Sequence, residues 1–137
     1  MGENEIGTII LEEAIGLHRE LGPGLLESVY EVVLARCLTD RGLKVRRQVS
    51  VPIRFRGVSF DEGFRADLIV SEKVLVELKS VETVTAAHKK QVLTYLRLTG
   101  LKLGYLLNFS EAVLKNGVTR CVNGLEETPL RLGVPAR

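Results

Sequence analysis

The sequence is poor in cysteine, which narrows the chemistry that the chain can support. Only Cys37 and Cys121 occur among its 137 residues, and they form no Cys-x-x-Cys pair. Two isolated thiols cannot build a zinc cage and are a weak basis for a disulfide framework. We therefore expect two small apolar core side chains, without structural zinc or disulfides.

Long apolar runs and a basic leader are also missing. No stretch approaches the roughly 20 apolar residues that a membrane-spanning helix needs. The chain begins Met-Gly-Glu-Asn-Glu, which lacks the basic start and apolar core of a signal peptide. These absences predict a soluble, cytoplasmic protein with no membrane partner.

Charge of either sign is not in large excess. The chain has 19 Lys and Arg residues and 17 Asp and Glu residues, which gives a formal net charge of +2. This permits a phosphate-rich partner but does not require one, because proteins that coat DNA are far more basic. With 45% hydrophobic and 26% charged residues, the chain suits one globular domain. We expect that domain at residues 1–125 and a loosely structured C-terminal tail at 126–137.

Hydrophobic periodicity predicts three helices. Apolar residues recur at helical spacing over about residues 5–21, 26–41 and 86–99. Gly22-Pro23-Gly24 separates the first two of these segments and stops the first helix. A short helical turn is expected around residues 112–114.

Apolar runs with alternating or continuous patterns predict the strands. They lie at about residues 44–55, 58–60, 66–70, 74–78, 103–109 and 118–122. Pro52 favours an edge position or a bulge for the first run, because proline cannot donate to a strand ladder. The strand before the third helix should run parallel to the strand after it. The predicted fold class is α/β, a mixed α+β arrangement with a central mixed sheet of about four to five strands flanked by helices.

Charged residues inside two apolar strands are the main candidates for chemistry. Asp67 interrupts one strand, while Glu77 and Lys79 share one face of the next because strand side chains alternate. Charged groups are rare in such strands unless they are paired or bind a metal. Mg²⁺ prefers carboxylate oxygens, with water completing its octahedron. Asp67, Glu77 and the backbone carbonyl of Leu78 could supply ligands; a structural ion pair with Lys79 is the alternative.

Three motifs follow one another along the chain. Asp67 is followed by Glu77-Leu78-Lys79, residues 24–30 read Gly-Leu-Leu-Glu-Ser-Val-Tyr, and residues 91–95 read Gln-Val-Leu-Thr-Tyr. Together they resemble the GxxExxY family of the PD-(D/E)XK nuclease superfamily, with Ala66 where a proline usually precedes the aspartate. The resemblance spans about Asn4 to Leu125 and implies a restriction-endonuclease-like core.

The resemblance implies a role for each matched residue. The metal ligands for Mg²⁺, with Mn²⁺ as a substitute, would be Asp67, Glu77 and the backbone carbonyl of Leu78. Lys79 would orient or help to deprotonate the attacking water. Glu27 would close the site from its helix, and Gln91 would reach back toward it from another.

Three further residues are secondary candidates because they share a helix face with a matched residue. They are Tyr30, Tyr95 and His88. The tyrosines also suit packing with a hydrogen-bonding tip, and the histidine also suits a solvated or structural position. Glu27 itself also suits the start of a helix, where acids interact favourably with the dipole.

The implied function is a Mg²⁺-dependent nuclease that hydrolyses phosphodiester bonds in DNA. No base-sequence specificity is expected, because no separate recognition module fits into this length. The alternative is a catalytically silent module on the same fold that binds nucleic acid or protein, with a homodimer among its forms.

Overall fold

The computed structural model describes residues 1–126. Its elements are α1 (Glu3–Leu21), α2 (Glu27–Asp40), β1 (Val45–Phe55), β2 (Val58–Val70), β3 (Val74–Lys79), α3 (Ala86–Thr99), β4 (Leu103–Asn108), the 3-10 helix η1 (Leu114–Gly117) and β5 (Val118–Val122). The predicted tail at 126–137 lies outside the described residues, apart from Glu126. All three predicted helices are present, and the short turn expected at 112–114 is displaced to η1.

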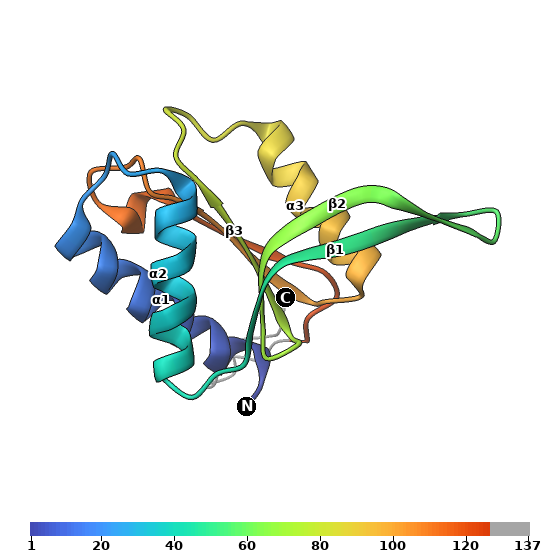
Figure 1. Cartoon of the computed structure of the whole chain (residues 1–137), viewed down its shortest axis with the longest axis horizontal. Helices are drawn as coiled ribbons and strands as arrows, with labels where there is room; N and C mark the ends of the chain where they lie inside the picture. Colours follow the sequence, from blue (N-terminus) through green and yellow to red (C-terminus); the bar gives the residue numbers. More distant parts are fainter. Residues whose placement is uncertain (127–137) are drawn as a thin grey trace, which may run out of the picture.

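The strands form one mixed sheet in the order β1-β2-β3-β4-β5. The pairing of β3 with β4 is parallel, as predicted, and the other pairings are antiparallel. In Figure 1, α1 and α2 lie on one side of the sheet and α3 on the other. These features confirm the α/β fold class with a restriction-endonuclease-like core.

Each side of the sheet has its own apolar core. The larger core packs α1 and α2 against the sheet around Tyr30 and Phe109, both fully buried. The smaller one packs α3 on the opposite side around Leu75 and Leu106. Strand β4 is buried along its whole length because both cores cover it, as its continuous apolar run predicts.

The predicted strand at residues 58–60 is not a separate element. It is the first part of β2, a single strand of 13 residues that pairs with β1 as far as a tight turn. Arg56 and Gly57 form that turn with φ angles of 51° and 78°. Residues 61–63 are polar or glycine but continue the strand. The prediction placed a break there because it relied on apolar runs alone. Pro52 lies where the register shifts on edge strand β1, as expected.

The far end of the β1–β2 hairpin projects from the body (Figure 1). We call residues 50–63 the arm. Residues 52–62 are all exposed, whereas residues 68–70 of the same hairpin are buried. Within the arm only Val51, at its base, is buried.

The two cysteines differ in their surroundings. Cys121 is buried, as predicted for a core thiol, but Cys37 is only partly buried, near Glu13 and Glu20 of α1. Both are free thiols. Within residues 1–126, no helix is both long and apolar enough to cross a bilayer.

Candidate functional site

Asp67 and Glu77 meet where β2 and β3 part. The register of this strand pair ends at Leu68 and Val76, one residue before the two acids. There the backbone N–H of Asp67 donates to Glu77 Oε2 at 2.7 Å, and the N–H of Leu78 donates to Asp67 Oδ2 at 2.9 Å. Each carboxylate is therefore held by the backbone of the opposite strand.

Glu77 is buried and Asp67 partly buried, and the two acids are electrostatically coupled. Burial, with the neighbouring charge of Asp67, raises the pKa of Glu77 to about 8. Burial also raises the pKa of Asp67, and the charge of Glu31 acts in the same direction. Two carboxylates this close disfavour each other's ionised forms, so a cation between them would relieve the repulsion.

Lys79 follows on β3 and is partly buried. Its charge acts on both acids, lowering the pKa of Asp67 and of Glu77 against the larger effect of burial. Nevertheless, its ammonium lies in no ion pair within 4.0 Å among the described residues. The structural ion pair considered as an alternative is thus not formed, and the ammonium is available to a ligand.

Glu27 reaches the same region from α2. It is the first residue of that helix, and its Oε2 accepts a hydrogen bond from the backbone N–H of Ser80 at 3.0 Å. Glu27 thus lies at a helix start, as expected, and also contacts the backbone that follows β3. The segment after β3 is also fixed by Asn108, whose amide bonds both the N–H and the carbonyl of Val81.

Glu31 is a buried acid that sequence reasoning missed. It accepts hydrogen bonds from Arg47 at 3.0 Å and from Gln48 at 2.6 Å, and Gln48 also donates to Asp67 Oδ1 at 3.3 Å. Gln48 bridges the two acids from a left-handed backbone conformation with φ of 52°. A signal existed, because Glu31 occupies the same buried helix face as Leu34.

Gln91 and Tyr95 approach from α3. Tyr95 stacks on Phe64 with ring centroids 3.3 Å apart, and Gln91 is hydrogen-bonded to the Tyr95 hydroxyl. Burial, with the charge of Glu77, raises the pKa of Tyr95, so the ring lies within electrostatic reach of the acids. Gln91 is itself exposed and reaches the site through Tyr95.

The remaining secondary candidates have structural contacts. The Tyr30 hydroxyl donates to the Gly22 carbonyl and accepts from the Leu25 N–H, and its ring stacks on Phe109. His88 forms a capping box with Thr85, whose N–H donates to His88 Nδ1 at 3.0 Å. Both residues therefore hold helix starts or loops in place.

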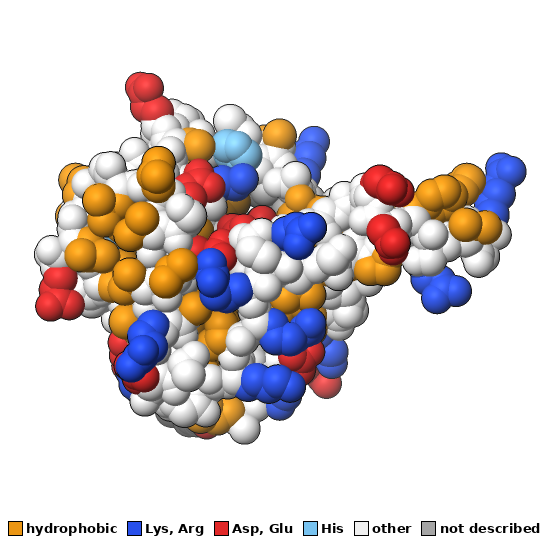
Figure 2. All heavy atoms as spheres, viewed as in Figure 1, with side chains coloured by type: hydrophobic (Ala, Val, Ile, Leu, Met, Phe, Trp, Pro, Cys, Tyr) orange, Lys and Arg blue, Asp and Glu red, His pale blue; other side chains and the backbone are white. Residues whose placement is uncertain are grey.

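An open hollow borders the end of β3. It has a volume of about 450 Å³. Its lining residues are Leu25, Leu26, Glu27, Ser28 and Ser80. The Ser80 hydroxyl is buried and has no hydrogen-bond partner within residues 1–126. Figure 2 shows acidic side chains gathered beside Lys and Arg side chains between the helices and the base of the arm.

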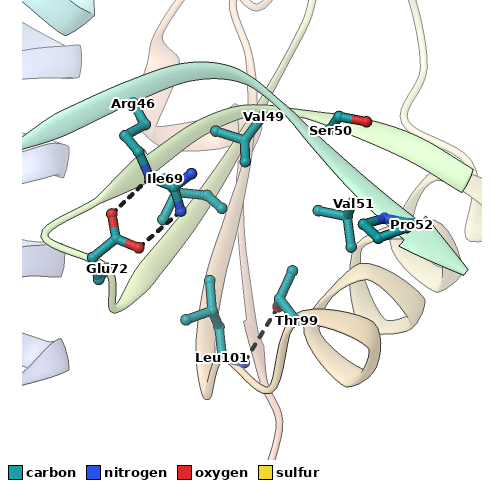
Figure 3. A pocket seen from close by; sticks show the side chains of 9 residues that line it. All are labelled: Arg46, Val49, Ser50, Val51, Pro52, Ile69, Glu72, Thr99 and Leu101. Carbon is teal, nitrogen blue, oxygen red and sulfur yellow. Dashed lines mark hydrogen bonds and ion pairs between the residues drawn. The ribbon is translucent and has the colours of Figure 1, made fainter. Parts of the chain in front are cut away.

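A second hollow, of about 340 Å³, lies between β1 and the end of α3 (Figure 3). Its charged residues are already paired, because Arg46 donates two hydrogen bonds to Glu72 at 2.7 and 2.8 Å. Thr99 Oγ1 accepts the Leu101 N–H. None of the predicted site residues lines this hollow, so the chemistry is expected at the acids.

The donor set fits a hard cation rather than a soft one. No group of three His, Cys, Asp or Glu side chains is arranged to hold a metal within residues 1–126. Two carboxylates are present, each with one oxygen bound to backbone, and Oδ1 of Asp67 also accepts a hydrogen bond from Gln48 Nε2 at 3.3 Å. Mg²⁺ typically takes one or two carboxylates and keeps several waters.

Comparison with protein families gives one match. The model of the PD-(D/E)XK nuclease superfamily matches residues 4–121, most of the described chain. Searches of curated proteins and of solved structures returned no match.

Proposed function

The chain belongs to the PD-(D/E)XK nuclease superfamily, and on this basis we propose that it is a Mg²⁺-dependent nuclease that hydrolyses phosphodiester bonds in DNA. The observation that carries the proposal is the arrangement at the end of β3: Glu77 is buried, Asp67 is partly buried and coupled to it, and Lys79 forms no ion pair with another residue of 1–126. Burying two like charges is unfavourable unless a cation or a proton compensates them.

In the proposed mechanism, Asp67, Glu77 and the carbonyl of Leu78 hold the cation. Bound Mg²⁺ supplies charge neutralisation at the phosphate and makes a water more acidic. Lys79 stabilises negative charge that develops on the phosphate, from a site partly shielded from solvent. Mn²⁺ is expected to substitute for Mg²⁺.

The helices position this chemistry. We propose that Glu27 closes the site and fixes the backbone of Ser80 after β3. Gln91 orients Tyr95 beside Glu77. The catalytic domain comprises residues 1–125, and contacts to phosphate give it no base-sequence preference.

We also propose that the chain belongs to the GxxExxY branch, because each motif residue has a physical task. Gly24 adopts φ of 102°, which favours glycine in the turn before α2. Tyr30 closes that turn through Gly22 and Leu25, while Glu27 connects the helix to β3.

A cleavage assay tests the proposal. Labelled single-stranded, double-stranded and branched DNA, with RNA in parallel, would be incubated with Mg²⁺, with Mn²⁺ and with chelator. Cleavage should require the metal. Lys79→Met should lower it by about a hundredfold or more, as for other single electrostatic catalysts, while Mg²⁺ still stabilises the variant in thermal melts.

Lys115→Met is the matched control, because Lys115 is exposed on η1 and contacts none of the site residues. It should cleave like the unmodified chain. Full activity of Lys79→Met, or cleavage that persists in chelator, would contradict the mechanism. Mg²⁺ binding without cleavage of any substrate would instead indicate a silent binding module.

A further inference from the structure

Four apolar side chains share one face of the outer part of the arm, and we call them the arm face. The register pairs Ile53 with Phe60 and Phe55 with Val58. Cross-strand partners share a face, as do residues two apart on one strand, so these four side chains lie together. Each is between 39% and 59% exposed, and Figure 2 shows apolar side chains toward the end of the arm.

The arm face is large for a surface feature. Aromatic side chains carry about 150–250 Å² each, so four residues about half exposed present roughly 400 Å². Monomeric proteins seldom leave a larger contiguous apolar patch without a function. The arm face is therefore suited to an apolar partner.

A second apolar patch lies on the outer side of α2 and the turn before it. Its residues are Leu25, Leu26, Val29 and Val32, which are between 37% and 73% exposed. Val29 and Val32 are three apart and occupy one helix face, opposite the buried face of Tyr30 and Leu34. We call this the helix patch; its exposed area is similar to that of the arm face.

We propose that two copies of the chain form a dimer in which each arm face docks on the helix patch of the other copy. A two-fold axis would make both contacts at once, since an isologous interface repeats each contact. Four patches of this size together bury about 1,500 Å², close to the roughly 1,600 Å² of standard stable interfaces. Either contact alone would bury about half of that.

Nucleic acid is the competing occupant of the arm face, because two arginines lie beside it. Arg54 pairs with Ser59 on the opposite face, and Arg56 lies in the turn with its guanidinium 5.0 Å from the Phe55 ring. Arms that enter DNA grooves combine apolar wedges with cations that contact the DNA. The combined area of the two patches nevertheless favours a second copy of the chain, and the association measurement separates the two occupants.

Sedimentation velocity over a range of concentrations, in chelator and without substrate, tests the dimer. The unmodified chain should associate with a dissociation constant in the micromolar range or tighter. Phe55→Ser/Phe60→Ser removes the arm contact, and Val29→Ser/Val32→Ser removes the helix contact with little change in helix propensity. Because two contacts are lost, each variant should associate on the order of a thousandfold more weakly, at about 30-fold per contact.

Mixing the two variants is the decisive step. The arm of the helix variant can still dock on the helix patch of the arm variant, so one of the two contacts is restored. The mixture should associate about 30-fold more tightly than either variant alone. Val113→Ser/Val122→Ser is the control, since these residues are 56% and 43% exposed but lie outside both patches; it should associate like the unmodified chain.

Four outcomes would overturn the proposal: a monomer at every concentration, equal weakening by the control, unweakened association of the arm variant, or no gain on mixing. Loss of DNA affinity in the arm variant, without any change in association, would instead assign the arm to nucleic acid. Circular dichroism spectra and melts confirm that the variants fold. Association is measured without cleavage, so a failed nuclease proposal leaves this test intact.

Discussion

Strand β2 passes through two opposite environments within 13 residues. Its C-terminal residues 66–70 are buried or nearly so, in contact with both cores, whereas residues 58–62 are exposed on the arm. In the buried half a charged residue, Asp67, stands among apolar ones. In the exposed half Val58 and Phe60 stand in solvent.

Each half therefore inverts the usual rule that apolar groups are buried and charges exposed. Both inversions are unfavourable in the isolated chain, and the proposed cation and the proposed partner surface would relieve them. Strand β2 thus combines a folding role, at Leu68, with two proposed binding tasks on its N-terminal side.

The largest expected effect is on the free energy of unfolding, and it distinguishes the two halves of β2 by their contribution to folding. Leu68→Ala, in the fully buried half, should lower the free energy of unfolding by about 2–5 kcal/mol because it leaves a cavity. Phe60→Ala, on the arm, should lower it by less than about 0.5 kcal/mol at dilute protein concentration, as for most surface positions. Urea denaturation measures both. Similar losses for the two variants would show that the arm is packed in solution.

The next effect concerns pH and should reach a few kcal/mol. In the folded chain burial raises the pKa of Glu77 to about 8, from an ordinary value of 4.5. Between these values the folded state binds more protons than the unfolded state, so the free energy of unfolding should fall as pH rises from about 4.5 to 8 without metal. The stabilisation is complete below this window and lost above it.

Glu77→Gln supplies the control for this pH dependence, since its amide is neutral throughout and its carbonyl can accept the Asp67 N–H. Thermal melts in chelator at several pH values should show a flatter profile for this variant. An unmodified chain with no decline over the window would mean that Glu77 is ionised without a partner.

The third effect tests the acids with metal. Mg²⁺ at a hundredfold excess over its dissociation constant should stabilise the folded chain by about 2.7 kcal/mol, a rise of several degrees in Tm. Above about pH 8, where both acids are ionised, Asp67→Asn should raise the Tm of the metal-free protein because their repulsion is removed. At any pH it should abolish most of the rise on adding Mg²⁺. A destabilised metal-free variant beside a wild type indifferent to Mg²⁺ and Mn²⁺ would contradict the metal site.

The smallest effect compares two adjacent arginines at the base of the hairpin. Arg47→Met leaves the buried carboxylate of Glu31 with Gln48 alone and should lower the free energy of unfolding by about 1–2 kcal/mol. Arg46→Met breaks the exposed pair with Glu72 and should change it by less than about 1 kcal/mol. Equal losses in chemical denaturation would show that burial of Glu31 does not matter.

Much of the site could be predicted from the sequence because its residues interrupt regular patterns. Asp67 and Glu77 stand out in apolar strands, and the structure brings them together where β2 and β3 part. Glu31 and Gln48 were missed, because their contacts join α2, β1 and β2 across 17 to 19 positions of sequence. The spacing of residues within a single helix or strand gives no sign of such a contact.

The sequence by itself determined the elements that pack on a core. Helix α3 was predicted at residues 86–99 and begins and ends there, and the parallel pairing around it followed from the order of elements. Periodicity predicts these elements because burial of one side requires apolar residues at a spacing of 3.6 in a helix or 2 in a strand. Only the tertiary structure decided that 58–60 and 66–70 are one strand. Residues 61 and 62 between these runs are exposed, so the continuity of the strand depends on pairing with β1 and not on a pattern of burial.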